Sequence, residues 1–525
     1  MFDKLSQGQR VVIASIVSIV FFVGYQLAFG KQAAIDTNNT TQKTISTPTQ
    51  TLPKETQIAD LKTPATTTGS SLSTTLIKLV SKDKYEVTLG QNGAIAQYVL
   101  LEPKFKTHEG KQLELFSVGA HEAPLAIRFA DAKLNDEASK IPYTITSSSK
   151  SIEANGTVVT LQQSLSELNI TKTVTFYQDG KYNIVINMDK EVPFFLSPGF
   201  RPVVHTEMMT LAGVLLAFND DTTKTIEDGK AKVEEKFANV EAVAAEDHYY
   251  ASTMYNFEKP FTVSITSDLD KNPTAFIAGF NGIRVGGYIG PKNTDLLISI
   301  NPKLVNIIEY GYLTFMAKPM FDVLSWIEAK VGNWGWAIVI MTILVRLILF
   351  PLTLKGMISM NKIKELAPKM QELKEKYKGD AQKLNMHVLE LYKKHNANPL
   401  SGCLPLILQI PIFFALYKVL LGSVELKGAP WVLWITDLSE KDPYFILPIL
   451  MGATMFIQQR ITPMNFTDPM QEKILKYLPV VFTVFFVSFP AGLTLYWFVS
   501  NVLSVAQQYT VNRVLAKHKQ EQHHA

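Results

Sequence analysis

The stretch GNWGWAIVIMTILVRLILFPLTL, residues 332–354, decides the fold class of this chain. It is long enough to cross a bilayer, since about 20 predominantly apolar residues span the hydrocarbon core. Its only charged residue is Arg346, and a cation near the middle of a spanning helix costs about 2.5–3.5 kcal/mol on insertion scales. No other apolar segment contains an Asp or Glu that would pair with it. Arg346 therefore favours a water-filled cavity within the membrane.

A second interpretation is that the Arg346 side chain reaches the cytoplasmic head groups. Nine residues separate Arg346 from Lys355, about 13 Å along a helix, and a long cationic side chain covers part of such a distance. The aqueous accessibility of a cysteine at Thr342, one turn deeper, distinguishes the two interpretations.

Composition places the chain among membrane proteins. Of its 525 residues, 47% are apolar and 19% are charged, which is little charge for a soluble protein and too much length for one domain. The single cysteine, Cys403, excludes an internal disulfide and a cysteine-based metal site.

The first apolar segment, residues 11–29, follows Lys4 and Arg10. A cleaved signal peptide and an uncleaved anchor both fit this pattern. The segment has 19 residues, against about 7–15 in the apolar part of a signal peptide, which favours an uncleaved anchor over residues 1–30. Residues 31–75 are rich in Thr, Ser, Gln and Pro, which predicts a disordered periplasmic tether.

Residues 76–303 contain short runs of alternating apolar and polar residues, such as TVVTLQQS and YNIVINM, separated by turn-like pieces. This pattern predicts an all-β sandwich. Residues 224–247 are more polar, and we expect a helix or a mobile loop there.

Residues 304–330 predict an amphipathic helix, broken or kinked at Pro319. A helix lying in the membrane interface and an ordinary soluble one both fit, and the adjacent spanning segment favours the interface.

Further apolar segments follow residue 354, and the last two of them predict a tight helical hairpin. With the anchor, they predict a multi-pass α-helical membrane protein of six spans. The five later spans are expected at residues 331–354, 401–423, 443–459, 475–490 and 491–510.

The charges of the connecting loops predict the orientation, because Lys and Arg collect on the cytoplasmic side. Residues 355–400 and the tail 511–525 are basic, whereas residues 424–442 carry four acidic residues. Both termini are therefore expected in the cytoplasm and the β domain in the periplasm.

Within residues 355–400, two apolar stripes at helical spacing meet at Lys378-Gly379-Asp380, which predicts a cytoplasmic helical hairpin. The stripes are most simply the mutual core of the two helices. The methionines and lysines would also suit soft contacts with partners or lipid head groups. The candidate contact residues are Lys362, Met370, Lys374 and Lys376.

No pattern for bond chemistry stands out. The chain has no P-loop, HExxH or GxSxG motif. His205 with Glu207, and Asp247 with His248, are interpreted as surface or strand pairs. We expect no enzyme activity, no catalytic residue, no cofactor, no metal and no recognition of a nucleic-acid sequence.

The C-terminal half closely resembles the YidC family of membrane protein insertases. The resemblance is carried by VRLILFPLT at 345–353, NPLSGCLPLILQIPIFFALY at 398–417, DPYFILPILMGATMF at 442–456, TDPMQEKI at 467–474 and FPAGLTLYWFVSN at 489–501. The anchor, tether and β domain match the Gram-negative form, whose periplasmic domain is a β-supersandwich.

This resemblance implies five core helices around a hydrophilic groove that is open to the cytoplasm and to lipid. Arg346 matches the groove arginine, with Thr342 one turn before it and Gln409 at a polar groove position. Tyr496 is followed by Trp497 where many relatives have a second tyrosine.

The implied function is that of an insertase and chaperone. It would move short polar segments of nascent membrane proteins across the inner membrane and release their helices into the lipid bilayer. It would act alone or with a Sec-type translocon, and on chains from the ribosome, although the short tail argues against a strong ribosome contact. A multi-pass transporter or channel, and a membrane-tethered carbohydrate-active enzyme, are the rival functions. The first would need substrate-binding charges or an inverted repeat, and the second would need paired acids in a β-domain cleft.

Overall fold

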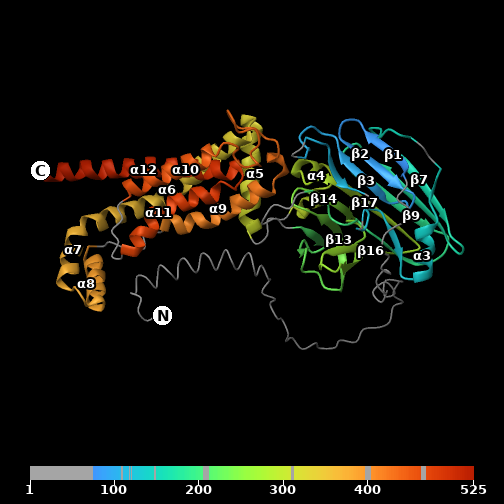
Figure 1. The fold of residues 1–525 in the computed structure, drawn as a ribbon, viewed down its shortest axis with the longest axis horizontal. Helices are drawn as coiled ribbons and strands as arrows, with labels where there is room; N and C mark the ends of the chain where they lie inside the picture. The colour runs from blue at the N-terminus through green and yellow to red at the C-terminus, as the bar shows by residue number, and fades with distance from the viewer. Residues whose placement is uncertain are drawn as a thin grey trace. The chain divides into compact units, whose positions relative to one another are not determined.

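The structure is a computed structural model. It describes residues 75–107, 110–117, 119, 121–146, 149–204, 212–308, 313–395, 404–462 and 469–524. These residues form two compact units, a β unit and a helical unit (Figure 1). The expected anchor at 1–30, the tether before residue 75, and the pair His205 and Glu207 lie outside the described residues.

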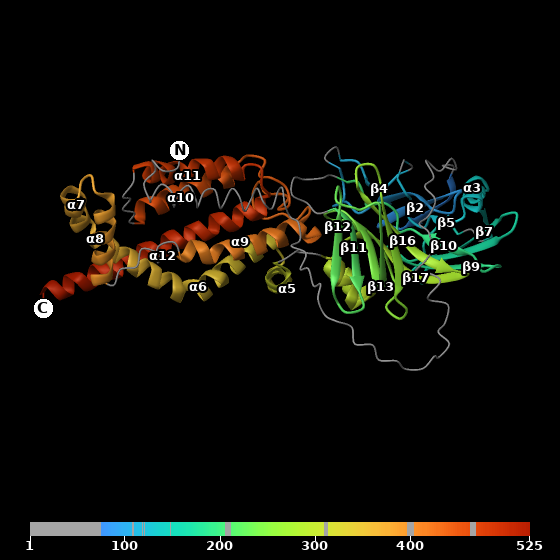
Figure 2. The same cartoon turned by 90° about the horizontal axis from the view of Figure 1, so that it is seen from below.

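The β unit contains a four-stranded sheet, in the order β1-β2-β3-β4, and a thirteen-stranded sheet (Figure 2). Every strand pairing in both sheets is antiparallel. The small sheet consists of β1 Thr75–Ser81, β2 Tyr85–Gly90, β3 Ile95–Leu100 and β4 Leu113–Phe116. The large sheet consists of β5 Ile127–Phe129, β6 Thr144–Ile145, β7 Thr157–Ser164, β8 Asn169–Phe176, β9 Lys181–Met188, β10 Pro193–Leu196, β11 Gly213–Phe218, β12 Thr223–Glu227, β13 Glu234–Glu246, β14 Tyr250–Tyr255, β15 Phe261–Ser267, β16 Pro273–Phe280 and β17 Gly282–Pro291.

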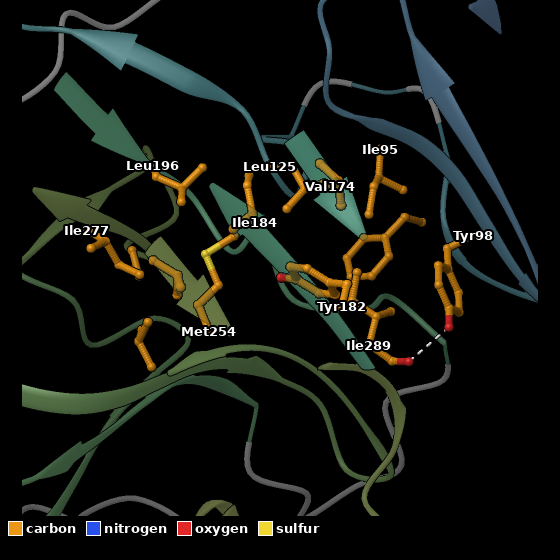
Figure 3. Close-up of a cluster of buried hydrophobic side chains, with 14 of the residues drawn as sticks. Ile95, Tyr98, Leu125, Val174, Tyr182, Ile184, Leu196, Met254, Ile277 and Ile289 are labelled. Atoms are coloured by element: carbon orange, nitrogen blue, oxygen red, sulfur yellow. Dashed lines mark hydrogen bonds between the residues drawn. The ribbon is translucent and has the colours of Figure 1, made fainter. Parts of the chain in front are cut away.

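The core of this unit lies between the two sheets. Side chains alternate across each strand, so one face of β8 and β9 is buried, and Val174 pairs directly with Ile184 across them. Tyr98 of the small sheet reaches into the same core, where its hydroxyl donates to the Ile289 carbonyl of β17 at 2.9 Å (Figure 3). The predicted all-β domain is therefore present.

The expectation of a helix or mobile loop at residues 224–247 was wrong, because this segment forms most of β12 and all of β13. The strand β13 lies inside the large sheet and pairs with β11, β14 and β15. Its run from Ala242 to Ala245 is fully buried, so small side chains at those positions pack beneath neighbouring strands. Alanine favours helices in isolation, and tertiary packing overrides that preference here.

Three short helical segments complete the β unit. They are α3 Ala132–Lys140, α4 Thr294–Ile300 and the 3₁₀ helix η2 Pro302–Ile307. Each begins at a side-chain cap: Asp131 for α3, Asn293 for α4 and Asn301 for η2.

The helical unit holds the remaining helices, which appear in yellow to red in Figure 1. They are α5 Thr314–Val331, α6 Trp334–Glu365, α7 Ala367–Lys376, α8 Ala381–Lys394, α9 Leu404–Gly422, η5 Val424–Leu426, α10 Ile446–Ile461, α11 Pro469–Phe486 and α12 Ala491–His524. Among the described residues, only α6 is both long enough and apolar enough to cross a membrane by these two criteria. Shorter apolar helices cover Gln409–Gly422, Ile446–Ile461 and Lys476–Phe486, so six spans remain a prediction.

Several helix ends differ from the expected ones. Helix α6 continues past residue 354 to Glu365, and α7 begins at Ala367 with Pro368 in its first turn, where a proline is tolerated. Helix α12 likewise runs through the expected tail to His524. Helix α5 is not broken at Pro319, which sits inside it and lacks only one backbone N–H donor.

A candidate polar cavity in the helical unit

Helix α6 positions Arg346 inside the helical unit. Asn333 starts this helix, since its side chain accepts a hydrogen bond from Trp336 N at 3.0 Å. Thr342, Arg346 and Thr353 then follow at helical spacing, and all three are buried, with Arg346 only 9% exposed. The side chain of Arg346 therefore lies inside the bundle.

Neutral groups hold the guanidinium. Arg346 donates from Nε to Ser500 Oγ at 3.1 Å and from Nη2 to the same oxygen at 2.5 Å. Its Nη2 also donates to Gln409 Oε1 at 3.2 Å, and Gln409 Nε2 donates to Ser500 Oγ at 2.9 Å. Within the part of the chain that the structure describes, no recorded ion pair includes Arg346. The positive charge is thus solvated by amide and hydroxyl dipoles and is not neutralised.

A small cavity of about 10 Å³ lies beside this group, which is about the volume one water molecule needs. One part of its wall is polar and another is apolar. It is lined by Thr342, Val345, Arg346, Leu349, Thr353, Gln409, Ile412, Tyr496 and Ser500. Helices α6, α9 and α12 therefore each contribute polar side chains to one enclosed space.

The structure brings together four of the five residues expected in the groove: Arg346, Thr342, Gln409 and Tyr496. The fifth, Trp497, is not among the cavity-lining residues. Its ring packs instead in an aromatic cluster, with ring centroids 4.7 Å from Phe413 and 5.2 Å from Phe486.

Ser500 lines the same cavity, and the sequence analysis did not predict it. It lies one helical turn after Tyr496, so the two share a face of α12, and that spacing was the available signal. Serine is common and uncharged, so nothing else in the sequence marks it. The structure makes its hydroxyl the shared acceptor for Arg346 and Gln409.

The expected helical hairpin of residues 355–400 consists of α7 and α8, joined at Gly379 and Asp380. Gly379 has a φ of +102°, and the Asp380 side chain accepts a hydrogen bond from Lys383 N at 3.0 Å, as the predicted cap requires. Met370 is buried in the hairpin, where Tyr392 donates its hydroxyl to Met370 Sδ at 3.0 Å.

Of the expected contact residues, Met370 is therefore core, whereas Lys362 and Lys376 are exposed and Lys374 is half-buried.

The described residues contain no group of three or more His, Cys, Asp or Glu side chains that would hold a metal ion. Asp247 is buried in the turn between β13 and β14, where its Oδ1 accepts hydrogen bonds from Tyr249 N and Tyr250 N. Burial raises the pKa of Asp247 to about 6. Its carboxylate closes a turn, which gives it a structural role.

The chain thus combines a β-rich unit with a helical unit that contains apolar helices and a buried polar cavity. Residues 326–520 match the family described as 60Kd inner membrane protein, and residues 79–323 match the YidC periplasmic domain. The chain belongs to the YidC family of membrane protein insertases, and is thus an inner-membrane protein whose β unit is the periplasmic domain.

Relatives named membrane protein insertase YidC support this assignment over the full length. The Campylobacter jejuni protein is 48% identical, covering 98% of this chain and 98% of its own. The Wolinella succinogenes protein is 46% identical, covering 99% and 97%. A solved structure titled as an active YidC insertase with its first transmembrane domain resolved is 18% identical, with a TM-score of 0.38 over 83% of this chain and 95% of that chain.

Proposed function

We propose that this protein inserts nascent membrane proteins by giving their short polar segments a hydrated site at Arg346. The observation that carries the proposal is a buried guanidinium whose recorded hydrogen bonds, within the described residues, go to the neutral side chains of Ser500 and Gln409. Its charge is available to attract acidic residues of an entering segment. The same charge keeps water in the cavity, because a buried cation without solvation is very costly.

The mechanism needs no bond to form or break. A polar segment that crosses hydrocarbon leaves its backbone groups without hydrogen bonds. A wet site partway into the bilayer shortens that dry path. The adjoining apolar helix then moves sideways into lipid, and the burial of its apolar surface drives the overall transfer.

The proposed topology has six spans: the anchor at residues 1–30 and the helices α6, α9, α10, α11 and α12, with both termini in the cytoplasm. Several of these helices have fewer apolar residues than a full span, which local thinning of the bilayer would accommodate. Helix α5, with Phe315 and Trp326 exposed, would lie in the membrane interface.

The exposed lysines of the α7–α8 hairpin, including Lys362 and Lys376, would contact lipid head groups or the emerging chain. A Sec-type translocon and the ribosome are the proposed larger partners.

The test compares Arg346→Ala with Arg346→Lys, which keeps a charge but loses the forked geometry. Each variant is supplied at equal amount in membrane vesicles, with one substrate whose translocated tail is acidic and one whose tail is neutral. We expect Arg346→Ala to impair the acidic substrate more than the neutral one, and Arg346→Lys to retain part of the difference. Full insertion of both substrates by Arg346→Ala would refute the role of the charge.

Deleting the β unit separates this proposal from a carbohydrate-active enzyme. An insertase keeps insertion without that unit, whereas an enzyme of the β domain loses its activity. A transporter or channel is distinguished by solute flux through vesicles, which we expect to be absent.

A further inference from the structure

A polar stripe runs along α12 from the cavity toward the end of the chain. Each residue turns a helix by about 100°, which places seven polar side chains within an arc of about 160°. They are Tyr496, Ser500, Asn501, Ser504, Gln507, Gln508 and Asn512. Ser500, Ser504 and Gln508 are each at most 5% exposed. Polar side chains buried along three turns of one helix need a reason, because apolar ones would pack there at lower cost.

The far end of this stripe is tied to two other helices by an amide junction, formed by Asn361, Gln508 and Asn512. Asn512 Oδ1 accepts from Asn361 Nδ2 of α6 at 3.0 Å and from Gln508 Nε2 at 2.8 Å. Asn512 Nδ2 donates to the carbonyl of Ile461, the last residue of α10, at 3.4 Å. Carbonyls at a helix C-terminus have no partner in their own helix, so Asn512 supplies one from α12.

The junction and the cavity are at different depths. Arg346 and Asn361 are 15 residues apart on α6, about 22 Å along the helix axis. The amide junction therefore holds α6, α10 and α12 together well away from the guanidinium. Among the side chains that the structure describes, none from α9 is recorded in the junction, and Gln409 of α9 bonds to Arg346 and Ser500 at the cavity.

Two polar atoms on the stripe have no hydrogen-bond partner among the described residues: Asn501 Nδ2 and Gln507 Oε1, both buried. Such atoms are costly when dry, and water reaching the stripe would satisfy them. Separating α6 from α12 would admit that water but break the bond between Asn361 and Asn512. The closed state has the hydrogen bond between Asn361 and Asn512, and the open state has hydrogen bonds from water to Asn501 and Gln507 instead. Because similar hydrogen bonds are lost and gained, we expect the two states to have similar free energies.

We propose that the amide junction is a clasp, which closes the polar stripe on α12 to water when the bond between Asn361 and Asn512 is made. In this structure the clasp is shut, and a small cavity lies beside Arg346. Opening at Asn361–Asn512 joins that cavity to the aqueous phase beyond the junction. The role of the clasp in insertion rests on the proposed function. The opening of the clasp is measured without an insertion assay.

The test places a cysteine at Ser504, between the clasp and the cavity, in the full-length chain with its single native Cys403 changed to serine. Its reaction rate with a membrane-impermeant thiol reagent is measured in vesicles that expose the C-terminus. Asn361→Leu and Asn512→Leu should each raise the rate roughly three- to tenfold, the factor for losing one net hydrogen bond of ordinary strength. Thr510→Leu is the matched control, because Thr510 is exposed and the recorded hydrogen bond of its hydroxyl, within the described residues, goes to Ala506 of its own helix.

The double variant Asn361→Leu/Asn512→Leu should react no faster than the quicker single variant, since both changes open one clasp. Equal rates in the parent and both single variants would overturn the proposal, as would a rise of the same size in Thr510→Leu. A second measurement guards against misfolding: cysteines at 361 and 512, joined by a short reducible cross-linker, should slow insertion until the linker is reduced. Insertion unaffected by that cross-link would also overturn the clasp. If the charge of Arg346 has no role in insertion, that result appears separately, as full insertion of both substrates by Arg346→Ala.

Discussion

Lys172 offers a quantitative test of the β domain. It lies on the buried face of β8, in line with Ile170 and Val174, and is fully buried. Its ammonium donates to the carbonyls of Gly93 and Leu125, each at 2.8 Å, and lies 5.0 Å from the centroid of the Tyr143 ring. No recorded ion pair in the described part of the chain includes Lys172.

Burial lowers the pKa of Lys172 from 10.5 to about 7. That interval corresponds to about 5 kcal/mol between the charged and neutral forms. Between pH 7 and 10.5 the unfolded chain binds more protons at this site than the folded chain does. The free energy of unfolding therefore rises with pH through this window, and Lys172 alone should add about 2 kcal/mol between pH 7 and pH 9. Below pH 7 both states are protonated and the full cost remains.

Lys172→Met should abolish this rise. Methionine has a similar length and no charge, although it leaves the carbonyls of Gly93 and Leu125 without a donor, at about 1–3 kcal/mol each. The absolute stability at pH 7 is therefore a poor readout, and the slope with pH is the decisive one. Lys84→Met is the matched control, because Lys84 is exposed and its variant should keep the slope of the parent.

The six tryptophans of the chain all lie between residues 326 and 497, so tryptophan fluorescence does not report on the β domain. Hydrogen exchange of peptides from β8 and β9 in the full-length protein does, after correction for the intrinsic effect of pH. If the free energy of unfolding has the same pH slope in Lys172→Met and in the parent, Lys172 is not neutral near pH 8 in the folded state, and the reasoning is refuted.

Three further predictions concern other sites. Ser500→Ala removes the shared acceptor of Arg346, so the initial rate of insertion of an acidic-tailed substrate should fall several-fold, and Ser500→Thr should restore most of it. Gly452→Ala places a Cβ 1.9 Å from Thr483 Oγ1, so α10 and α11 should separate at a cost of about 1–3 kcal/mol in thermal unfolding, partly recovered by Thr483→Ala. The raised pKa of Asp247, about 6, makes the folded domain lose up to about 3 kcal/mol as pH rises from 4 toward 7, and Asp247→Asn should be flat over that range by hydrogen exchange.

Much of the fold follows from local patterns in the sequence. The alternation of apolar residues in β7, β8 and β9 predicted strands, and Gly379 with Asp380 predicted the turn and cap between α7 and α8. The pattern failed at β13, because the polar residues of 224–247 predicted a helix or a mobile loop, whereas the second half of β13 is buried among neighbouring strands. Which strands cover a segment is a long-range property, and local composition does not contain it.

The sequence predicted those residues of the candidate site whose type is unusual in an apolar helix or matches a family motif. Arg346 stands out because a charge inside an apolar run is costly, and the family resemblance added Gln409 and Tyr496. Trp497 was expected beside them, but one residue along a helix turns the side chain by about 100°, into the aromatic cluster with Phe413. Ser500 is ordinary in type, and only the packing of α12 against α6 gives its hydroxyl a role.

Helix α12 is not apolar enough on average to be identified as a membrane span, although the proposed function places it in the membrane. A membrane helix needs apolar residues only where it meets lipid, and its inward face can be polar if those groups are satisfied by protein or water. On α12 the exposed positions include Val502 and Val514, whereas Ser500, Ser504 and Gln508 are buried. The inward residues lower the average apolarity of the helix, and they are also the ones that reach Arg346 and the amide junction. If this reasoning holds, replacing Ser504 and Gln508 with leucine makes α12 a more apolar helix and a poorer component of the insertase.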